Sequence, residues 1–354
     1  MSQLSSSVRL EECPAVEWEP IAKPRPARDA ALDFTKGALV LFMVLYHWLN
    51  YFVSTQGHYY NYLRFLTPSF IFITGFMISQ IHLQKYGASG WQLSKRLIVR
   101  GLKLLGVFIG LNIFIGAALG GPQFRHSLTA SLLSALISGR ITVSAGQKSS
   151  AFDVLVPIAY LLILSALLTI AIRRFKHIFQ FALALFVVGI VVLDHYGISS
   201  LYLDLLMMGL LGVVFGFARR DQIAAVAGHP YVLIALYCIF LTIITFWDVT
   251  LPLQVLSVVL TTPLLYIAGS AESAPGLVRR RTIMLGKYSL LGYIVQIAVL
   301  RALKGIAAPS EHGVGVSIVC LSLGILATVA TAELTDSARR RSRMAKKLYE
   351  LVFA

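Results

Sequence analysis

The segment Asp33-Phe-Thr-Lys36-Gly37-Ala-Leu-Val-Leu-Phe-Met-Val-Leu-Tyr46-His47 places three ionisable side chains in an otherwise mostly apolar stretch. Lys36 and His47 are separated by about three helical turns, so a helix presents both on one face, about 16 Å apart along its axis. Asp33 shares that face. Ionisable groups inside membrane spans cost about 2.5–3.5 kcal/mol at the helix centre and usually face a cavity, a partner or a proton path. This stretch is therefore the candidate functional helix.

The composition of the chain indicates a membrane protein. Of its 354 residues, 57% are hydrophobic and 13% are charged, and the mean hydropathy is +0.76, outside the range of soluble domains. Apolar runs of about twenty residues recur, the length that an α-helix needs to cross about 30 Å of hydrocarbon. The short alternating segments of a membrane barrel are absent. We predict an all-α integral membrane protein.

The chain divides into a membrane domain and two tails. Residues 1–28 are polar and proline-containing, and we predict a disordered cytoplasmic tail there; residues 29–336 form the membrane domain and 337–354 a basic cytoplasmic tail. The segment 120–150 holds an apolar piece too short to cross, so it is interpreted as re-entrant or external. About ten spans are predicted, at 31–53, 64–82, 100–119, 151–172, 178–194, 199–218, 229–247, 250–270, 283–303 and 313–334.

The positive charges support this topology. With both termini in the cytoplasm, 25 of the 31 Lys and Arg residues fall in cytoplasmic segments, as expected because Lys and Arg accumulate in short cytoplasmic loops. This asymmetry explains the net charge of +15 without a nucleic acid, so the lipid bilayer is the expected partner. The three cysteines have no metal-site spacing, and no metal site is predicted.

The first candidate site consists of Asp33, Lys36 and His47. An imidazole is suited to take a proton from a hydroxyl or an amine, because its ordinary pKa of about 6.5 lies near working pH. We therefore interpret the three residues as catalytic candidates. The alternatives are a histidine that merely packs against a neighbouring helix and a lysine that extends toward the membrane interface.

The second candidate site consists of Arg96, Arg100 and Lys103, near the cytoplasmic end of the third predicted span. Spacings of four and three residues place these cations on one helix face. Such a face can hold a phosphate-bearing ligand. The alternative is that these cations only set the topology and contact lipid headgroups.

The third candidate site lies on the external side and includes Asp153, Tyr202 and Asp204. Carboxylates and aromatic rings there can hydrogen-bond to a sugar and stack on it, and they are our candidates for substrate binding. Solvated loop ends are the alternative. Asp204 lies inside its predicted span and is expected to need a partner there.

Motifs at the two ends of the chain resemble one known family. They are Leu32-Asp33-x-x-Lys36-Gly37 followed by His47, then Phe65-x-x-Pro68-x-Phe70-Ile-Phe-Ile-Thr74-Gly75-Phe76, and near the other end Leu285-Gly286-Lys287-Tyr288-Ser289-x-x-x-Tyr293-x-x-Gln296. Together they resemble the membrane acyltransferase 3 family, which opens with Leu-Asp-x-x-Arg-Gly and a later histidine. The segment 151–155 is similar to one in the glucan succinyltransferase branch.

The resemblance implies an acyltransferase of the cell inner membrane. Such an enzyme moves an acetyl or another short acyl group from acyl-CoA, here acetyl-CoA or succinyl-CoA, to a carbohydrate or glycolipid acceptor, with O-acylation favoured over N-acylation. On this basis His47 matches the catalytic histidine, and Arg100-x-x-Lys103 matches an Arg-x-x-Arg pair that contacts CoA. The chain departs from the family pattern at Lys36, which replaces an arginine, and at Gln296, which replaces a histidine.

Other functions remain open at this point. A related enzyme class N-acetylates an amino sugar and uses a similar opening motif. A transporter of small solutes or lipids would use Lys36, His47 and Asp204 as a charge relay. A catalytically inactive relative is the third alternative. Uptake without consumption of acyl-CoA would distinguish the transporter from the enzymes.

Overall fold

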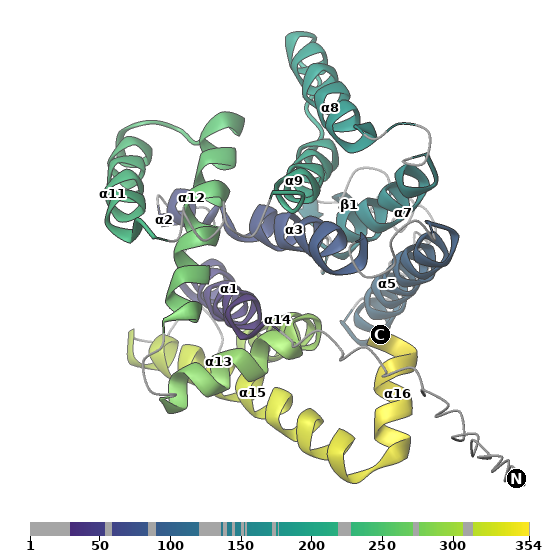
Figure 1. Cartoon of the computed structure of the whole chain (residues 1–354). Helices are drawn as coiled ribbons and strands as arrows, with labels where there is room; N and C mark the ends of the chain where they lie inside the picture. The colour runs from purple at the N-terminus through teal and green to yellow at the C-terminus, as the bar shows by residue number, and fades with distance from the viewer. Residues whose placement is uncertain are drawn as a thin grey trace, which may run out of the picture.

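The structure is a computed structural model in which helices of very different tilt pack side by side (Figure 1). The residues that it describes are 29–53, 59–83, 90–119, 136, 140–143, 146–149, 152, 154–171, 175, 177–218, 228–271, 276–306 and 314–353. The predicted tail 1–28 lies outside them.

The helices cover nearly all of the described chain. They are α1 (Ala30–Trp48), α2 (Tyr59–Leu63), α3 (Leu66–Met77), α5 (Gly90–Leu119), α7 (Leu155–Ala171), α8 (Ile178–His195), α9 (Leu201–Phe215), α11 (Pro230–Phe246), α12 (Leu251–Ser270), α13 (Leu277–Lys287), α14 (Ser289–Ile306), α15 (Val314–Arg341) and α16 (Arg343–Phe353). Two π-helical segments, η1 (Leu49–Val53) and η2 (Ile78–Leu83), extend α1 and α3.

The prediction of an all-α integral membrane protein is confirmed. Among the described residues, seven helices are long and apolar enough to cross a membrane: Ala30–Val53, Tyr59–Gln80, Trp91–Phe114, Ile178–His195, Leu251–Ser270, Ser289–Ile306 and Gly315–Arg341. The apolar helices α7, α9 and α11 are shorter, with 17, 15 and 17 residues. Each of the ten predicted spans coincides with one of these helices. The count of ten crossings and the side of the termini stay predictions.

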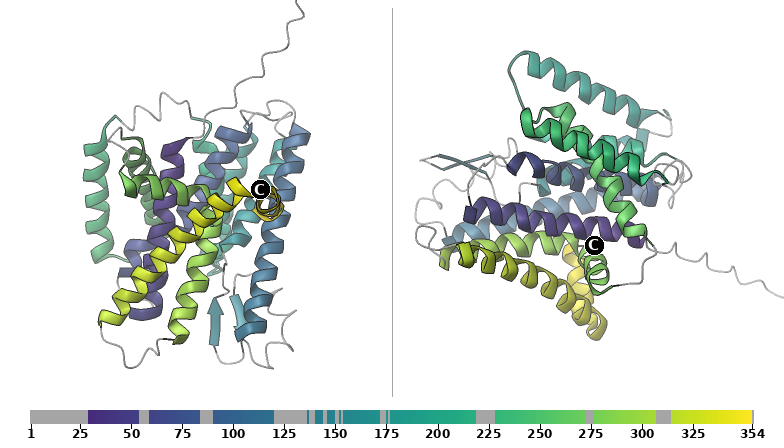
Figure 2. Two further views of the ribbon diagram at one scale, coloured as in Figure 1. Left: turned by 90° about the horizontal axis from the view of Figure 1, so that it is seen from below. Right: turned by 90° about the vertical axis from the view of Figure 1, so that its left-hand side faces the viewer.

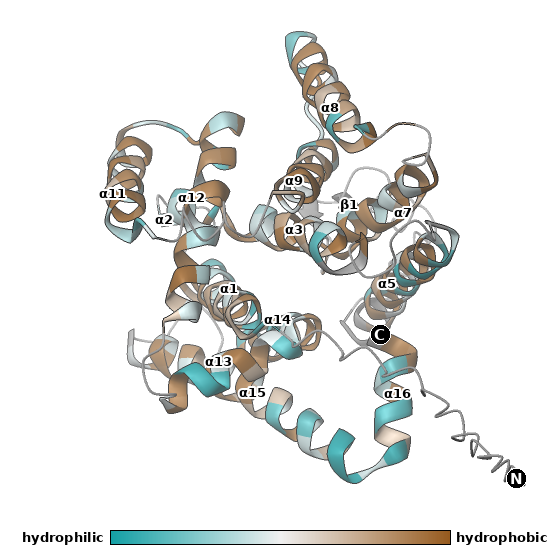
Figure 3. Cartoon of the chain, viewed as in Figure 1, coloured by the Kyte–Doolittle hydropathy of each residue, from teal (hydrophilic) through white to brown (hydrophobic). Residues whose placement is uncertain are grey.

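The outer helices are apolar on the faces that protein does not cover (Figure 3). Helix α8 exposes Phe181 and Val191 at 66% and 63%, and α11 exposes Tyr231 and Ile239 at 85% and 57%. Large apolar side chains exposed around a whole helix are typical of contact with lipid, because hydrocarbon is an apolar solvent. These helices therefore lie at the periphery of the membrane domain.

The structure differs from the predicted spans at three places. The predicted span 283–303 is interrupted at Tyr288, so that the arginine-rich α13 precedes α14. Its charged residues disfavour insertion into hydrocarbon, which explains the break. The predicted basic tail is helical, as the end of α15 and as α16. Within the segment 120–150, β1 (Arg140–Val143) and β2 (Gly146–Ser149) pair as an antiparallel hairpin.

Glycines allow two pairs of helices to touch backbone to backbone. In the contact of α1 with α13, a Cβ on Gly37 would lie 1.9 Å from the Thr282 carbonyl oxygen, and one on Gly286 would lie 1.6 Å from that of Asp33. In the contact of α3 with α9, a Cβ on Gly75 would lie 2.0 Å from the Gly209 oxygen. Small residues at such crossings let membrane helices approach closely. The two end motifs of the sequence therefore form one interface.

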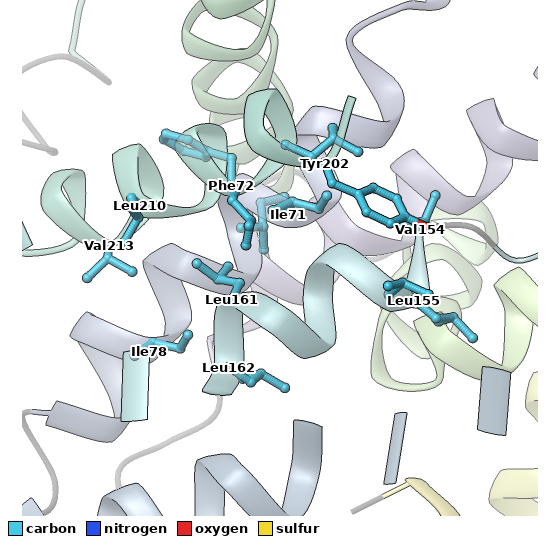
Figure 4. Close-up of a cluster of buried hydrophobic side chains, with 14 of the residues drawn as sticks. Ile71, Phe72, Ile78, Val154, Leu155, Leu161, Leu162, Tyr202, Leu210 and Val213 are labelled. Atoms are coloured by element: carbon cyan, nitrogen blue, oxygen red, sulfur yellow. The ribbon is translucent and has the colours of Figure 1, made fainter. Parts of the chain in front are cut away.

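The main core lies between α3, α7 and α9 (Figure 4). Ile71, Leu161 and Leu210 are each fully buried there. Tyr202 lies at one edge of this cluster, beside Val154 (Figure 4). This packing holds the first turns of α7 and α9 next to the end of α1, where the candidate site lies.

Candidate active site

The N-terminal end of α1 holds a buried ion pair. Asp29 caps the helix by accepting hydrogen bonds from the backbone amides of Ala31 and Leu32. One turn later, Lys36 Nζ lies 2.6 Å from Asp33 Oδ1, and both side chains are nearly removed from solvent. The carbonyl group of Asp33 faces Gly286 of α13. Asp33 and Lys36 thus compensate each other's charge at a tightly packed helix crossing.

His47 lies at the other end of α1. Its ring contacts Tyr46 in a T-shaped geometry, with centroids 5.2 Å apart, and stacks near Tyr51 at 5.8 Å. Both imidazole nitrogen atoms are buried, and neither has a hydrogen-bond partner among the described residues. Buried polar atoms are nearly always paired in proteins. Unpaired nitrogen atoms on a buried histidine therefore indicate a site that a substrate or water completes.

Sequence reasoning missed the residues that surround Tyr51. Arg301 of α14 donates from Nε to the Tyr51 hydroxyl oxygen at 3.3 Å, and Lys304 Nζ lies 5.4 Å from the centroid of the same ring. Arg301 also interacts electrostatically with His47. The available signal was topological, because Arg301 and Lys304 belong to the few cations that the predicted topology places outside.

A cavity of about 300 Å³ has Tyr46 in its lining. Its described lining combines aromatic, polar and apolar side chains from α1, α2, α3, α9 and α12, namely Tyr46, Leu63, Arg64, Thr67, Pro68, Val154, Leu201, Tyr202, Leu205 and Gln254. The Tyr46 hydroxyl also accepts a hydrogen bond from Tyr60. His47 is not among these lining residues. Tyr46 therefore contacts the histidine ring and also lines the cavity.

Of the residues predicted to bind the substrate on the external side, only some lie at the cavity. Tyr202 lines the cavity and is 5% exposed. Asp204 lies in the first turn of α9, half-buried and away from the described lining, and it interacts electrostatically with Asp194. Its backbone amide donates to the Ser200 carbonyl oxygen, whereas its carboxylate has no hydrogen bond or ion pair with the residues that the structure describes. Asp153 lies outside the described residues.

The cytoplasmic candidates Arg96 and Arg100 are exposed on α5, on the same face as Lys103. Lys103 donates from Nζ to the backbone oxygen of Glu350 in α16, at 3.2 Å. Helix α16 thus rests beside the cations that the sequence predicted to bind CoA.

The structure therefore separates the residues that the sequence predicted to be catalytic. Asp33 and Lys36 form one unit, whereas His47 lies about 16 Å or more along the same helix. A further polar residue faces α1 from α14: Gln296 is fully buried, and its amide nitrogen and oxygen have no partner in the described part of the chain. His47 and Gln296 thus belong to the buried polar side chains that lack partners among the described residues.

Helices long and apolar enough to span a bilayer, and a buried histidine whose neighbour Tyr46 lines a cavity, define a polytopic membrane protein with a candidate internal site. The comparisons identify the chemistry. A family model for an acyltransferase domain matches residues 29–333, so the chain belongs to the acyltransferase 3 family and is a membrane acyltransferase. This confirms the resemblance found in the sequence and favours an enzyme over a transporter. No curated protein and no solved structure matches the chain.

Proposed function

We propose that the protein transfers an acetyl or another short acyl group from cytoplasmic acyl-CoA to a hydroxyl group of a carbohydrate or lipid-linked glycan. The observation that carries the proposal is the position of His47, whose buried nitrogen atoms are unpaired and whose ring contacts Tyr46 at the cavity wall. Acyl transfer from a thioester needs a base, a nucleophile and a donor to the developing oxyanion. His47 supplies the base.

In the proposed reaction, His47 takes the proton of the acceptor hydroxyl while the hydroxyl oxygen attacks the thioester carbon. A C–O ester bond forms and the C–S bond breaks. The imidazolium then returns the proton to the CoA thiolate, so that free CoA leaves as a thiol. The unpaired amide of Gln296, on a helix that packs against α1, offers an N–H donor to the oxyanion.

The acyl donor is assigned to the cytoplasmic end of α5. Arg96, Arg100 and Lys103 present three cations on one helix face, which suits the phosphate groups of acetyl-CoA or succinyl-CoA. Charge reversal at Arg100 (Arg100→Glu) should weaken CoA binding. The matched control is Lys95→Glu, because Lys95 is also exposed but lies on another face of the helix. Equal CoA affinity in both variants would remove this assignment.

The acceptor is assigned to the cavity beside Tyr46. Tyr46 and Tyr202 provide aromatic surface there, and Arg64, Thr67 and Gln254 provide hydrogen-bonding groups. Sites that bind sugars combine these two kinds of group, so the lining supports a carbohydrate or glycolipid acceptor and O-acylation. A location in the cell inner membrane belongs to the same proposal.

The test is release of free CoA thiol by the purified protein in detergent, with acetyl-CoA or succinyl-CoA as donor and a membrane glycan extract as acceptor. The variant His47→Ala should abolish release. His195→Ala is the matched control, because His195 is an exposed histidine at the end of α8, and it should retain activity. If folded protein releases no thiol from either donor, the proposal fails, and an inactive relative becomes the better hypothesis.

A further inference from the structure

The C-terminal helix α16 has a marked division between polar and apolar faces. Its charged residues are Arg343, Lys346, Lys347 and Glu350, which gather on one side of the helix, and its apolar residues occupy the remainder. This pattern is typical of a helix that lies between water and an apolar environment. The proposed function makes no use of it.

One half of the apolar face of α16 is covered by the protein. The ring of Tyr349 lies 5.4 Å from that of Tyr288, and the Arg339 guanidinium lies 4.3 Å over the Tyr349 ring. Lys103 of α5 adds the hydrogen bond to the Glu350 carbonyl. The helix is thus held between the end of α15 and α5 (Figure 1).

The other half of the apolar face is exposed. Met344, Leu348 and Leu351 follow one another at spacings of four and three residues, and they are 81%, 62% and 68% exposed. Side chains at these spacings form one stripe along a helix. The part of the chain that the structure describes does not cover this stripe. A continuous apolar stripe next to exposed cations suits an apolar neighbour whose surface is anionic.

The orientation of α16 suits the surface of a bilayer. In Figure 2 (left), α16 is seen nearly end-on at the label C, whereas α1 and α5 run up and down. The helix therefore runs across the direction of the spans. Figure 3 shows the hydrophilic end of α15 leading into it, and Arg341, Arg343, Lys346 and Lys347 are all exposed there.

We propose that α16 is an interfacial helix that docks on the anionic leaflet of the surrounding bilayer. Met344, Leu348 and Leu351 enter the boundary between headgroups and acyl chains, while Arg343, Lys346 and Lys347 contact lipid phosphate groups. Amphipathic helices with cations beside an apolar face bind membranes in this way, and anionic lipids strengthen the binding. The proposal does not depend on the proposed enzymatic reaction.

The test places an environment-sensitive fluorophore on single cysteines of the full chain, after Cys13, Cys238 and Cys320 have been replaced. Leu348→Cys probes the exposed stripe, and Glu350→Cys is the matched control on the polar face. The labelled proteins are reconstituted into phosphatidylcholine vesicles with or without phosphatidylglycerol. Quenching is measured with brominated acyl chains and, separately, with aqueous iodide.

We expect brominated lipid to quench the label at 348 several-fold more than the label at 350, with an increase when phosphatidylglycerol is present. The triple variant Arg343→Gln, Lys346→Gln, Lys347→Gln should lose that increase. Strong iodide quenching at 348 would overturn the proposal, because the stripe would then face water. Shielding from both quenchers would overturn it as well, because a second copy or another protein would then cover the stripe.

Discussion

The two ends of α1 differ in whether their buried polar groups have partners. At the N-terminal end the polar groups are paired: Lys36 pairs with Asp33, and the Thr35 hydroxyl donates to the Ala31 carbonyl. At the C-terminal end, both nitrogen atoms of His47 and the side-chain oxygen of Asn50 are buried without partners in the described structure. Unpaired buried groups weaken a fold. Under the function proposed above, this difference fits a first end that maintains the structure and a second end that binds ligands.

The backbone shows the same contrast. The N-terminal half of α1 is a regular helix packed against α13 through Gly37. Beyond Trp48 the helix continues as the π-helical segment η1, which carries Tyr51. Wide π-helical turns are rare and frequently occur at functional sites. The site thus lies where the helix changes its geometry.

The largest expected effect comes from breaking the ion pair at the structural end. Asp33→Asn leaves the nearly buried ammonium group of Lys36 without its carboxylate, which should cost about 3–5 kcal/mol of stability. The loss is measured as a lower thermal unfolding midpoint in detergent. The double variant Asp33→Asn, Lys36→Met should recover most of it.

The double variant also sharpens the comparison. If it recovers stability and activity together, the pair is structural. If it recovers stability but releases no CoA thiol, Asp33 or Lys36 has a part in the reaction, and the separation of the two ends proposed above is wrong.

The second-largest expected effect is a loss of stability at the glycine contact between α1 and α13. Gly286→Ala would place a Cβ 1.6 Å from the Asp33 carbonyl oxygen, so α13 must move away from α1, at a cost of about 3 kcal/mol. Size-exclusion profiles after heating measure this loss. Gly106→Ala in α5 is the matched control, since nothing lies within 4 Å of its Cβ. Equal losses in both variants would contradict the proposed crossing.

A smaller effect is expected at the cavity wall. Tyr46→Phe removes the hydroxyl that bonds to Tyr60 and loosens the wall next to His47. We expect kcat/KM for the acceptor to fall about tenfold, equivalent to about 1.4 kcal/mol. The KM for acyl-CoA should not change. Tyr231→Phe serves as control, because Tyr231 is 85% exposed on α11. An unchanged kcat/KM would show that Tyr46 does not belong to the acceptor site.

The smallest expected effect is an increase in stability, whereas the larger effects above are losses. Gln296→Met replaces a fully buried amide that has no partner in the described residues, and it should raise stability by about 1 kcal/mol, because an unpaired polar group is removed. Acyl transfer should fall in the same variant if the amide donates to the oxyanion. A decrease in the unfolding midpoint would show that the amide is paired in the folded protein.

The sequence alone determined the class of protein, the positions of the apolar helices and the family. These features depend on local composition and on the periodicity of single helices. Both can be recognised from residues that are close together in the sequence. The break at Tyr288 is also local, but the charges of α13 could be read equally as the cytoplasmic end of one long span.

Only the tertiary structure decided which residues meet. Arg301 reaches Tyr51, Tyr46 shares a cavity with Gln254, and α16 rests on Lys103. The tertiary structure also placed Asp33 and Lys36 against α13 and away from His47. Each of these contacts joins helices that are distant in the chain. Which helices pair depends on how their surfaces pack, and glycines set the closest approach. A local sequence pattern does not contain this information.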